Sequence, residues 1–128
     1  MSSELDFRYE VPNRYSDDEL KHRINIQLAA SGSEIAAILS KNGISTDAGE
    51  VVKGSISENL SIKPAGAGID PATIAIVVSL VPVIKALTPL LEPFAKNAAD
   101  VGRVVALDIW EMVKSKLWEE QHVRLTRK

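Results

Sequence analysis

The chain has no cysteine among its 128 residues. It therefore has no disulfide framework, no thiolate nucleophile and no zinc site with cysteine ligands. The net charge is only −2, so no excess of basic residues is present to neutralise the phosphates of nucleic acid. We expect no nucleic-acid partner. The first residues, "MSSELDFRYEV", also lack the basic and apolar regions of a secretory signal, which predicts a cytoplasmic or membrane-associated protein without a signal peptide.

Motifs that would indicate a reaction are missing too. The two histidines, His22 and His122, lie one in each half of the chain and belong to no recognisable catalytic group. The glycine-rich stretch at 64–70 lacks the lysine of a phosphate-binding loop, and an aspartate stands where an anion would bind. Asp47 and Glu50 are too few ligands for a calcium site. The sequence therefore predicts a non-enzymatic protein with no catalytic residues, no cofactor and no metal.

Glycine and proline divide the chain unevenly. Six of the seven glycines come before residue 70, whereas five of the six prolines lie between residues 64 and 93. The stretch "KPAGAG" is typical of a flexible joint. We predict an α+β, mainly helical fold: a small strand-containing α+β unit at 1–63, a Gly/Ala linker at 64–69, and a hairpin at 70–128 made of an apolar helix and an amphipathic helix.

The N-terminal region begins with a clear strand pattern. In "ELDFRYEV", residues 4–11, apolar and charged side chains alternate strictly, which predicts a half-buried strand ended by the following proline. "RINIQLA", 23–29, repeats the alternation and predicts a second strand. Ser16 and Glu19 have the spacing of a capping box, so a short helical turn near 17–22 is the competing interpretation.

The rest of the N-terminal region contains one strong helix signal. In "SGSEIAAILSKNG", Ser33 is a candidate N-cap, apolar residues recur at helical spacing, and Gly43 has the position of a left-handed stop. The signals from 44 to 63 are weak, although "NLSIK" at 59–63 favours one more strand.

The segment after residue 70 is unusually apolar. Asp70 is a good N-cap and Pro71 suits the first helical position, and Lys85 is the only charge between residues 72 and 91. A helix built from this segment has no polar face, so it must lie in a large core or in lipid. The residues that define this apolar segment are Ile74, Val77, Val78, Val81, Ile84 and Leu87.

Prolines and one lysine complicate this helix. Pro82 would cost an interior position about 3 kcal/mol and would kink the helix. We favour one kinked helix over two short ones, at 71–80 and 82–88, and we expect a turn in "TPLLEP", 88–93. Lys85 argues against a conventional membrane span, although near a helix end its amine can snorkel to the interface.

The spacing of apolar residues over 93–121 predicts one amphipathic helix. This helix is too charged to cross a bilayer, but it could form an antiparallel hairpin with the apolar segment. Ala98, Gly102 and Ala106 stand four residues apart, a spacing that allows two helix backbones to approach closely. The facing partner is either Ala72, Ala75 and Ser79 of the preceding helix or another chain.

A second surface of this helix is apolar in part. Leu107 and Trp118 share a stripe on the otherwise polar side, with Val104 nearby. Isolated exposed apolar residues are common on proteins. The alternative is a contact surface for a partner or a membrane interface, to which Lys85 would contribute.

Two functions remain open. The first is a non-enzymatic helical association protein, a small membrane-associated effector or pore-type component that self-assembles through its C-terminal hairpin with copies of itself or with lipid. The alternative is a soluble adaptor or regulatory subunit that binds a protein partner through the same helices. Lys85 would be buried or snorkelling in the first case and solvated in the second.

Overall fold

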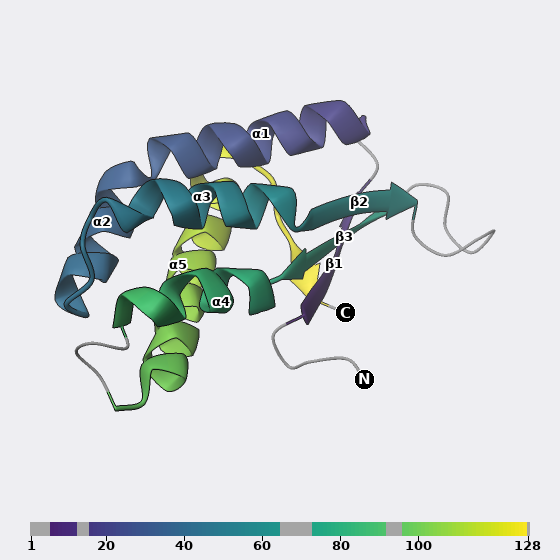
Figure 1. Cartoon of the computed structure of the whole chain (residues 1–128). Helices are drawn as coiled ribbons and strands as arrows, with labels where there is room; N and C mark the ends of the chain where they lie inside the picture. Colours follow the sequence, from purple (N-terminus) through teal and green to yellow (C-terminus); the bar gives the residue numbers. More distant parts are fainter. Residues whose placement is uncertain (1–5, 13–15, 65–72, 92–95, 128) are drawn as a thin grey trace.

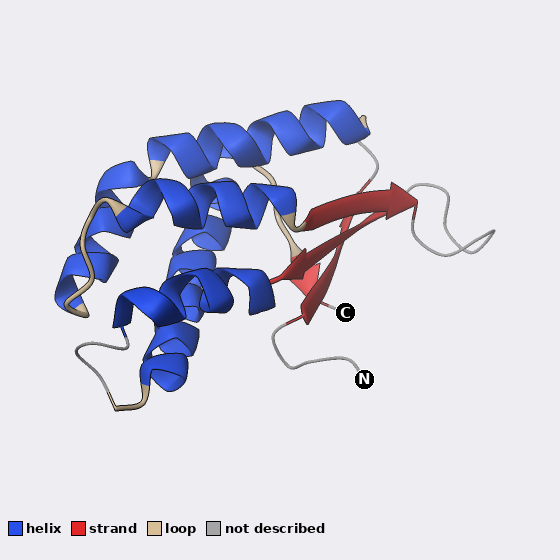
Figure 2. Cartoon of the chain, in the orientation of Figure 1, coloured by secondary structure: helices blue, strands red, loops and turns tan. Residues whose placement is uncertain are grey.

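The computed structural model describes residues 6–12, 16–64, 73–91 and 96–127. In this part of the chain, five helices pack with one four-stranded antiparallel sheet, and the sheet lies at one end of the molecule (Figure 2). The predicted α+β, mainly helical fold class is confirmed.

The elements follow one another along the chain as Figure 1 labels them. The strands are β1 (Asp6–Pro12), β2 (Leu60–Pro64), β3 (Thr73–Ser79) and β4 (Thr126–Arg127), in the spatial order β2-β3-β1-β4. The helices are α1 (Asp17–Ala30), α2 (Gly32–Lys41), α3 (Ala48–Glu58), α4 (Val81–Leu91) and α5 (Ala98–Gln121).

The alternating pattern of β1 is confirmed as a strand with one buried face. Phe7, Tyr9 and Val11 are buried, whereas Asp6 and Arg8 are exposed. Because side chains alternate along a strand, the register places the buried set on one side of the sheet. Tyr9 lies opposite Ile76 of β3, and Ile76 lies opposite Ile62 of β2. This face joins the main core cluster.

The predicted helix starting at residue 70 is wrong. Residues 73–79 form strand β3, which pairs with β1 on one side and with β2 on the other. Ile74, Val77 and Val78 of the predicted apolar segment are therefore strand residues, and so are Ala75 and Ser79. A segment rich in β-branched residues is typical of a strand, and Ala75, Ile76 and Val78 of this strand are buried. The predicted start at Asp70 and Pro71 lies outside the described residues.

The second half of the apolar segment is the short helix α4. Val81, Ile84 and Leu87 belong to it. Pro82 falls in its first turn, where the backbone N–H groups have no partner within the helix, so the expected kink at Pro82 is wrong. The helix continues through Pro89 to Leu91, so the expected turn does not begin at residue 88.

The predicted strand at 23–29 is also wrong, because these residues belong to helix α1. The competing capping box is confirmed: the Glu19 N–H donates to Ser16 Oγ at 3.1 Å. The helix buries Leu20, Ile24 and Leu28, which recur every four residues. Ile26, which completed the apparent alternation, is exposed.

The remaining N-terminal elements agree in part with the sequence. The helix at α2 is confirmed, and Gly43 has a φ of +75°, as a left-handed stop requires. The predicted N-cap Ser33 is wrong, because the helix begins at Gly32 and its N-cap is Ser31. The strand suggested by "NLSIK" is β2. Helix α3, which buries Ala48, Val52 and Ile56, was not predicted.

Helix α5 crosses the other helices (Figure 1) and contributes the largest share of the core. Its predicted end at residue 121 is confirmed. The predicted start at residue 93 is wrong, because residues 96 and 97 form a turn and the helix begins at Ala98 with Asn97 as its N-cap. His122 follows in the left-handed conformation, with φ 57°, and the Val123 N–H donates to Leu117 O at 3.0 Å.

The N-terminal and C-terminal regions share one sheet and one core. β1 and β2 come from the first region, β3 comes from the second, and all three pair together. Trp110 of α5 donates its indole N–H to the Tyr9 hydroxyl of β1 at 2.8 Å, and both side chains are buried. The predicted hairpin at 70–128 therefore begins with a strand of the common sheet, and the predicted linker lies almost entirely outside the described residues. No helix in the described ranges is long and apolar enough to cross a membrane.

Candidate interaction surface

The side of α5 that faces away from the core carries a regular row of side chains. We define the outer α5 face as Val104, Leu107, Glu111, Lys114, Trp118 and Gln121, whose spacing alternates between three and four residues. This spacing places all six along one line of the helix. Each of them is at least partly exposed.

Apolar side chains lie near both ends of this row: Val104 and Leu107 at one end, and Trp118 next to Gln121 at the other. Val104 is 53% exposed and Trp118 is 51% exposed. Leu107 is partly buried and packs against the core cluster with one side. The Arg124 guanidinium lies 5.6 Å from the centroid of the Trp118 ring. At an exposed site such a cation–π contact contributes about 0.5–1 kcal/mol and leaves the rest of the indole open to a partner.

The middle of the row is an ion pair. Lys114 Nζ lies 3.0 Å from Glu111 Oε2, and the Lys114 amine also sits 5.5 Å from the centre of the Tyr9 ring. Glu111 is exposed and Lys114 is half-buried. The apolar stripe in the sequence indicated Leu107, Trp118 and Val104. It gave no reason to include Glu111 and Lys114, although their spacing of three residues is visible in the sequence.

The small-residue stripe lies on the opposite side of α5. Ala98, Gly102 and Ala106 are buried. A Cβ atom added at Gly102 would lie 3.6 Å from Ile84 Cγ2 and 3.8 Å from Leu87 Cβ, so this stripe faces α4. The close approach that the spacing indicates is made within the chain, and its partners are α4 residues instead of the predicted Ala75 and Ser79. The predicted Ala72 lies outside the described residues.

Lys85 does not join these residues at a common surface. It lies on the exposed side of α4, whereas Ile84 and Leu87 of the same helix face α5. Ile84 and Ala86, the neighbours of Lys85 in the sequence, are partly buried, whereas Lys85 itself is exposed.

The C-terminal end of α5 is held by α1. Arg23 Nη1 donates to Gln121 O at 3.0 Å, and Gln27 Nε2 donates to Glu120 Oε2 at 3.0 Å and to Ser31 Oγ at 2.9 Å. The last carbonyls of a helix attract cations, so Arg23 stabilises an end that has no basic residue of its own. These contacts fix the helix end beside Trp118.

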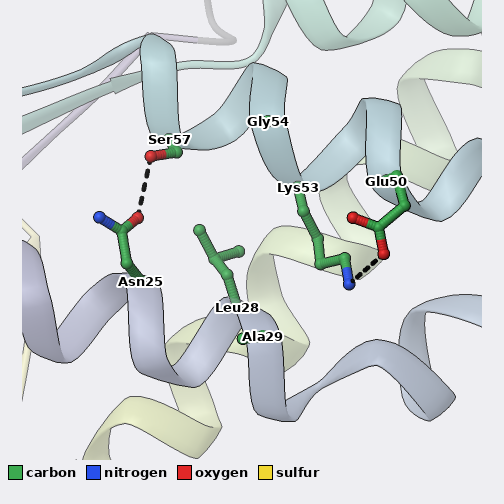
Figure 3. A pocket seen from close by; sticks show the side chains of 7 residues that line it. All are labelled: Asn25, Leu28, Ala29, Glu50, Lys53, Gly54 and Ser57. Atoms are coloured by element: carbon green, nitrogen blue, oxygen red, sulfur yellow. Dashed lines mark hydrogen bonds and ion pairs between the residues drawn. The ribbon is translucent and has the colours of Figure 1, made fainter.

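A shallow groove of about 230 Å³ lies between α1 and α3. Its polar side chains satisfy one another: Ser57 Oγ donates to Asn25 Oδ1 at 2.9 Å, and Lys53 Nζ lies 2.9 Å from Glu50 Oε1 (Figure 3). No nucleophile stands beside a base among the lining residues, so this groove has no catalytic arrangement. It is lined by Asn25, Leu28, Ala29, Glu50, Lys53, Gly54 and Ser57.

Among the described residues, the remaining histidine and acidic side chains form no catalytic group and no metal site. Both His22 and His122 are exposed. Among residues 6–12, 16–64, 73–91 and 96–127, no three histidine or acidic side chains are grouped closely enough to hold a metal ion. The outer α5 face is therefore taken as the candidate interaction surface.

Comparison of the chain with models of known protein families, with curated proteins and with solved structures gave no match.

Proposed function

We propose that this chain is a non-enzymatic association protein that binds another protein through the outer α5 face. The observation that supports the proposal is that Val104 and Trp118 are each more than half exposed on one line of a helix whose opposite side forms the core. This is the adaptor function of the two left open by the sequence. The first hypothesis, a membrane-associated effector or pore-type component, was based on one apolar helix after residue 70, and residues 73–79 of that segment form strand β3.

Regular spacing distinguishes this surface from the other exposed apolar residues. Ile26, Val51 and Leu90 are also exposed, but each lies on a different helix and scattered residues of this kind are normal. On α5, three apolar side chains recur along one line, as the anchors of a docked helix do. Tryptophan is enriched among the residues that contribute most to binding energy, and Trp118 offers an open indole.

Site-specific photocrosslinking in cells that express the protein tests this proposal. A photoreactive phenylalanine analogue is placed at position 104 or 118, and at position 51 as a matched control. Val51 is a suitable control because it is 50% exposed, close to the value for Val104, and lies on α3.

The proposal predicts a discrete protein adduct from positions 104 and 118 and none of that mass from position 51. Adducts of equal mass and yield from all three positions would show non-specific contact and would contradict it. The absence of any protein adduct from positions 104 and 118 would contradict it as well.

A further inference from the structure

We infer that the partner of the outer α5 face is a second copy of this chain, whose α5 packs antiparallel to the first about a two-fold axis. This inference rests on the proposed function, because it names the partner for the same surface. The argument is the complementarity of the surface with itself.

The alternating three- and four-residue spacing matches the core positions of a two-helix coiled coil. Val104, Glu111 and Trp118 occupy one of the two core positions, and Leu107, Lys114 and Gln121 occupy the other. In an antiparallel pair, a residue at the first core position of one helix faces a residue at the second core position of the other helix. Within one register, the numbers of the two facing residues add up to the same total for every pair.

One register of the antiparallel pair gives every residue of the row a facing residue in the other copy. It places Glu111 against Lys114 of the partner subunit and Leu107 against Trp118 of the partner subunit. Val104 then meets Gln121 of the partner subunit. Because a two-fold interface uses the same patch on both copies, each of these pairs occurs twice.

The charges favour this arrangement over a parallel one. Glu111 and Lys114 already form an ion pair within each helix, so the two pairs would form a ring of four alternating charges at the axis. A parallel pair would place Glu111 against Glu111 and Lys114 against Lys114, and like charges that face each other destabilise an interface. The antiparallel order also matches opposite helix dipoles.

The expected dimer is weak. Only six residues per protomer form the row, whereas a standard interface uses about 20–30 residues on each side. Lys114 also keeps its contact with the Tyr9 ring, so its amine has to serve both neighbours. We expect a dissociation constant of micromolar order or weaker, so the experiment needs high protein concentrations.

Charge reversal tests both the partner and the register. Sedimentation equilibrium of the full chain is measured from about 10 µM to 1 mM for the wild type, E111K, K114E and the double variant E111K/K114E. The homodimer of each single variant would place four like charges at the axis, so the dissociation constant of that homodimer should be at least tenfold higher than that of the wild type. The double variant restores opposite charges and should dimerise like the wild type.

The mixture of the two single variants is the most specific test of the register. E111K carries two lysines and K114E carries two glutamates at these positions, so an equimolar mixture should form a heterodimer although neither variant dimerises by itself. Far-UV circular dichroism controls for folding, which matters most for K114E because the Lys114 side chain is only 27% exposed and its amine lies over the Tyr9 ring.

A wild type that stays monomeric at 1 mM would overturn the inference, and so would single variants that dimerise like the wild type or a mixture that does not pair. A monomeric wild type with a photoadduct to a different protein at position 104 or 118 would overturn the second copy as partner while supporting the proposed function. Flotation with vesicles of phosphatidylcholine and phosphatidylglycerol tests whether the surface binds lipid instead. Both proposals would be overturned if the wild type stayed monomeric, gave no protein adduct, and bound these vesicles in a way that Trp118→Ala abolished.

Discussion

Gly102 lies where α5 meets α4, and replacing it with alanine tests how closely these two helices pack. A Cβ atom at this position would lie 3.6 Å from Ile84 Cγ2, 3.8 Å from Ile84 O and 3.8 Å from Leu87 Cβ. These are ordinary van der Waals distances, so the structure has room for one methyl group. It has no room for a longer side chain without movement of α4.

The expected gain in stability follows from the helix position and the chain length. Replacing glycine with alanine inside a helix stabilises the fold by about 1 kcal/mol, because the unfolded chain loses freedom. Since unfolding releases about 2.1 cal/mol/K per residue, 1 kcal/mol raises the melting temperature of 128 residues by about 4 °C. Gly102→Leu should instead lower the free energy of unfolding by about 1–3 kcal/mol through overpacking.

Urea unfolding followed by far-UV circular dichroism measures these changes, with Gly54→Ala as the matched control. Gly54 lies inside α3, and a Cβ atom added there would meet nothing within 4 Å. The control therefore reports the helix preference alone. If Gly102→Ala destabilised the protein while Gly54→Ala stabilised it, α4 and α5 would have to approach more closely than the structure shows, and the reasoning would be refuted.

Two further predictions concern buried pairing and backbone conformation. Tyr9→Phe removes the acceptor of the Trp110 indole N–H, which is buried, and should lower the free energy of unfolding by about 1–3 kcal/mol. Unchanged stability in urea would mean that this hydrogen bond contributes nothing. His122→Gly should raise the free energy of unfolding by about 1 kcal/mol, because His122 has a φ of 57° that costs a residue with a Cβ atom. Gly43→Ala, at φ +75°, should lower it by a similar amount, and changes of the same sign in these two variants would contradict the backbone argument.

The elements that were predicted correctly have signals confined to a few neighbouring residues. The alternation of Phe7, Tyr9 and Val11 gave β1, the spacing of Ser16 and Glu19 gave the start of α1, and Gly43 gave the end of α2. Each signal depends on local backbone geometry, which neighbouring residues determine by themselves. Tertiary contacts were not needed to interpret them.

The errors arose where two interpretations differ only in contacts between distant residues. Residues 74–78 are apolar without a break, and such a run fits either a buried helix or a central strand. Its high content of β-branched residues favoured the strand, but Asp70 and Pro71 resembled the start of a helix. The decision depends on β1 and β2, which lie far away in the sequence and pair with both edges of β3. At residues 23–29 the error was the reverse, a strand predicted where the structure has a helix. The exposed Ile26 completed an apparent alternation of apolar residues within helix α1.

The candidate surface was predictable only in part for the same reason. Leu107 and Trp118 were visible as an apolar stripe on a charged helix. The importance of Glu111 and Lys114 depends on knowing which side of α5 the core covers, and this is set by α4, β1 and α1. The groove between α1 and α3 was not accessible from the sequence, because α3 was not predicted and α1 was assigned in part to a strand.

Two features that suggested association are used inside the chain. The apolar run of β3 is paired on both edges by strands of the same chain, and the small-residue stripe of α5 packs on α4. Neither can be offered to a partner without breaking the core, so association has to use side chains that the core leaves exposed. On α5 these are the ends of the outer face and the ion pair between them. If the proposed function holds, stability and association depend on opposite sides of the same helix, and substitutions at Glu111 should affect association without weakening the core around Gly102.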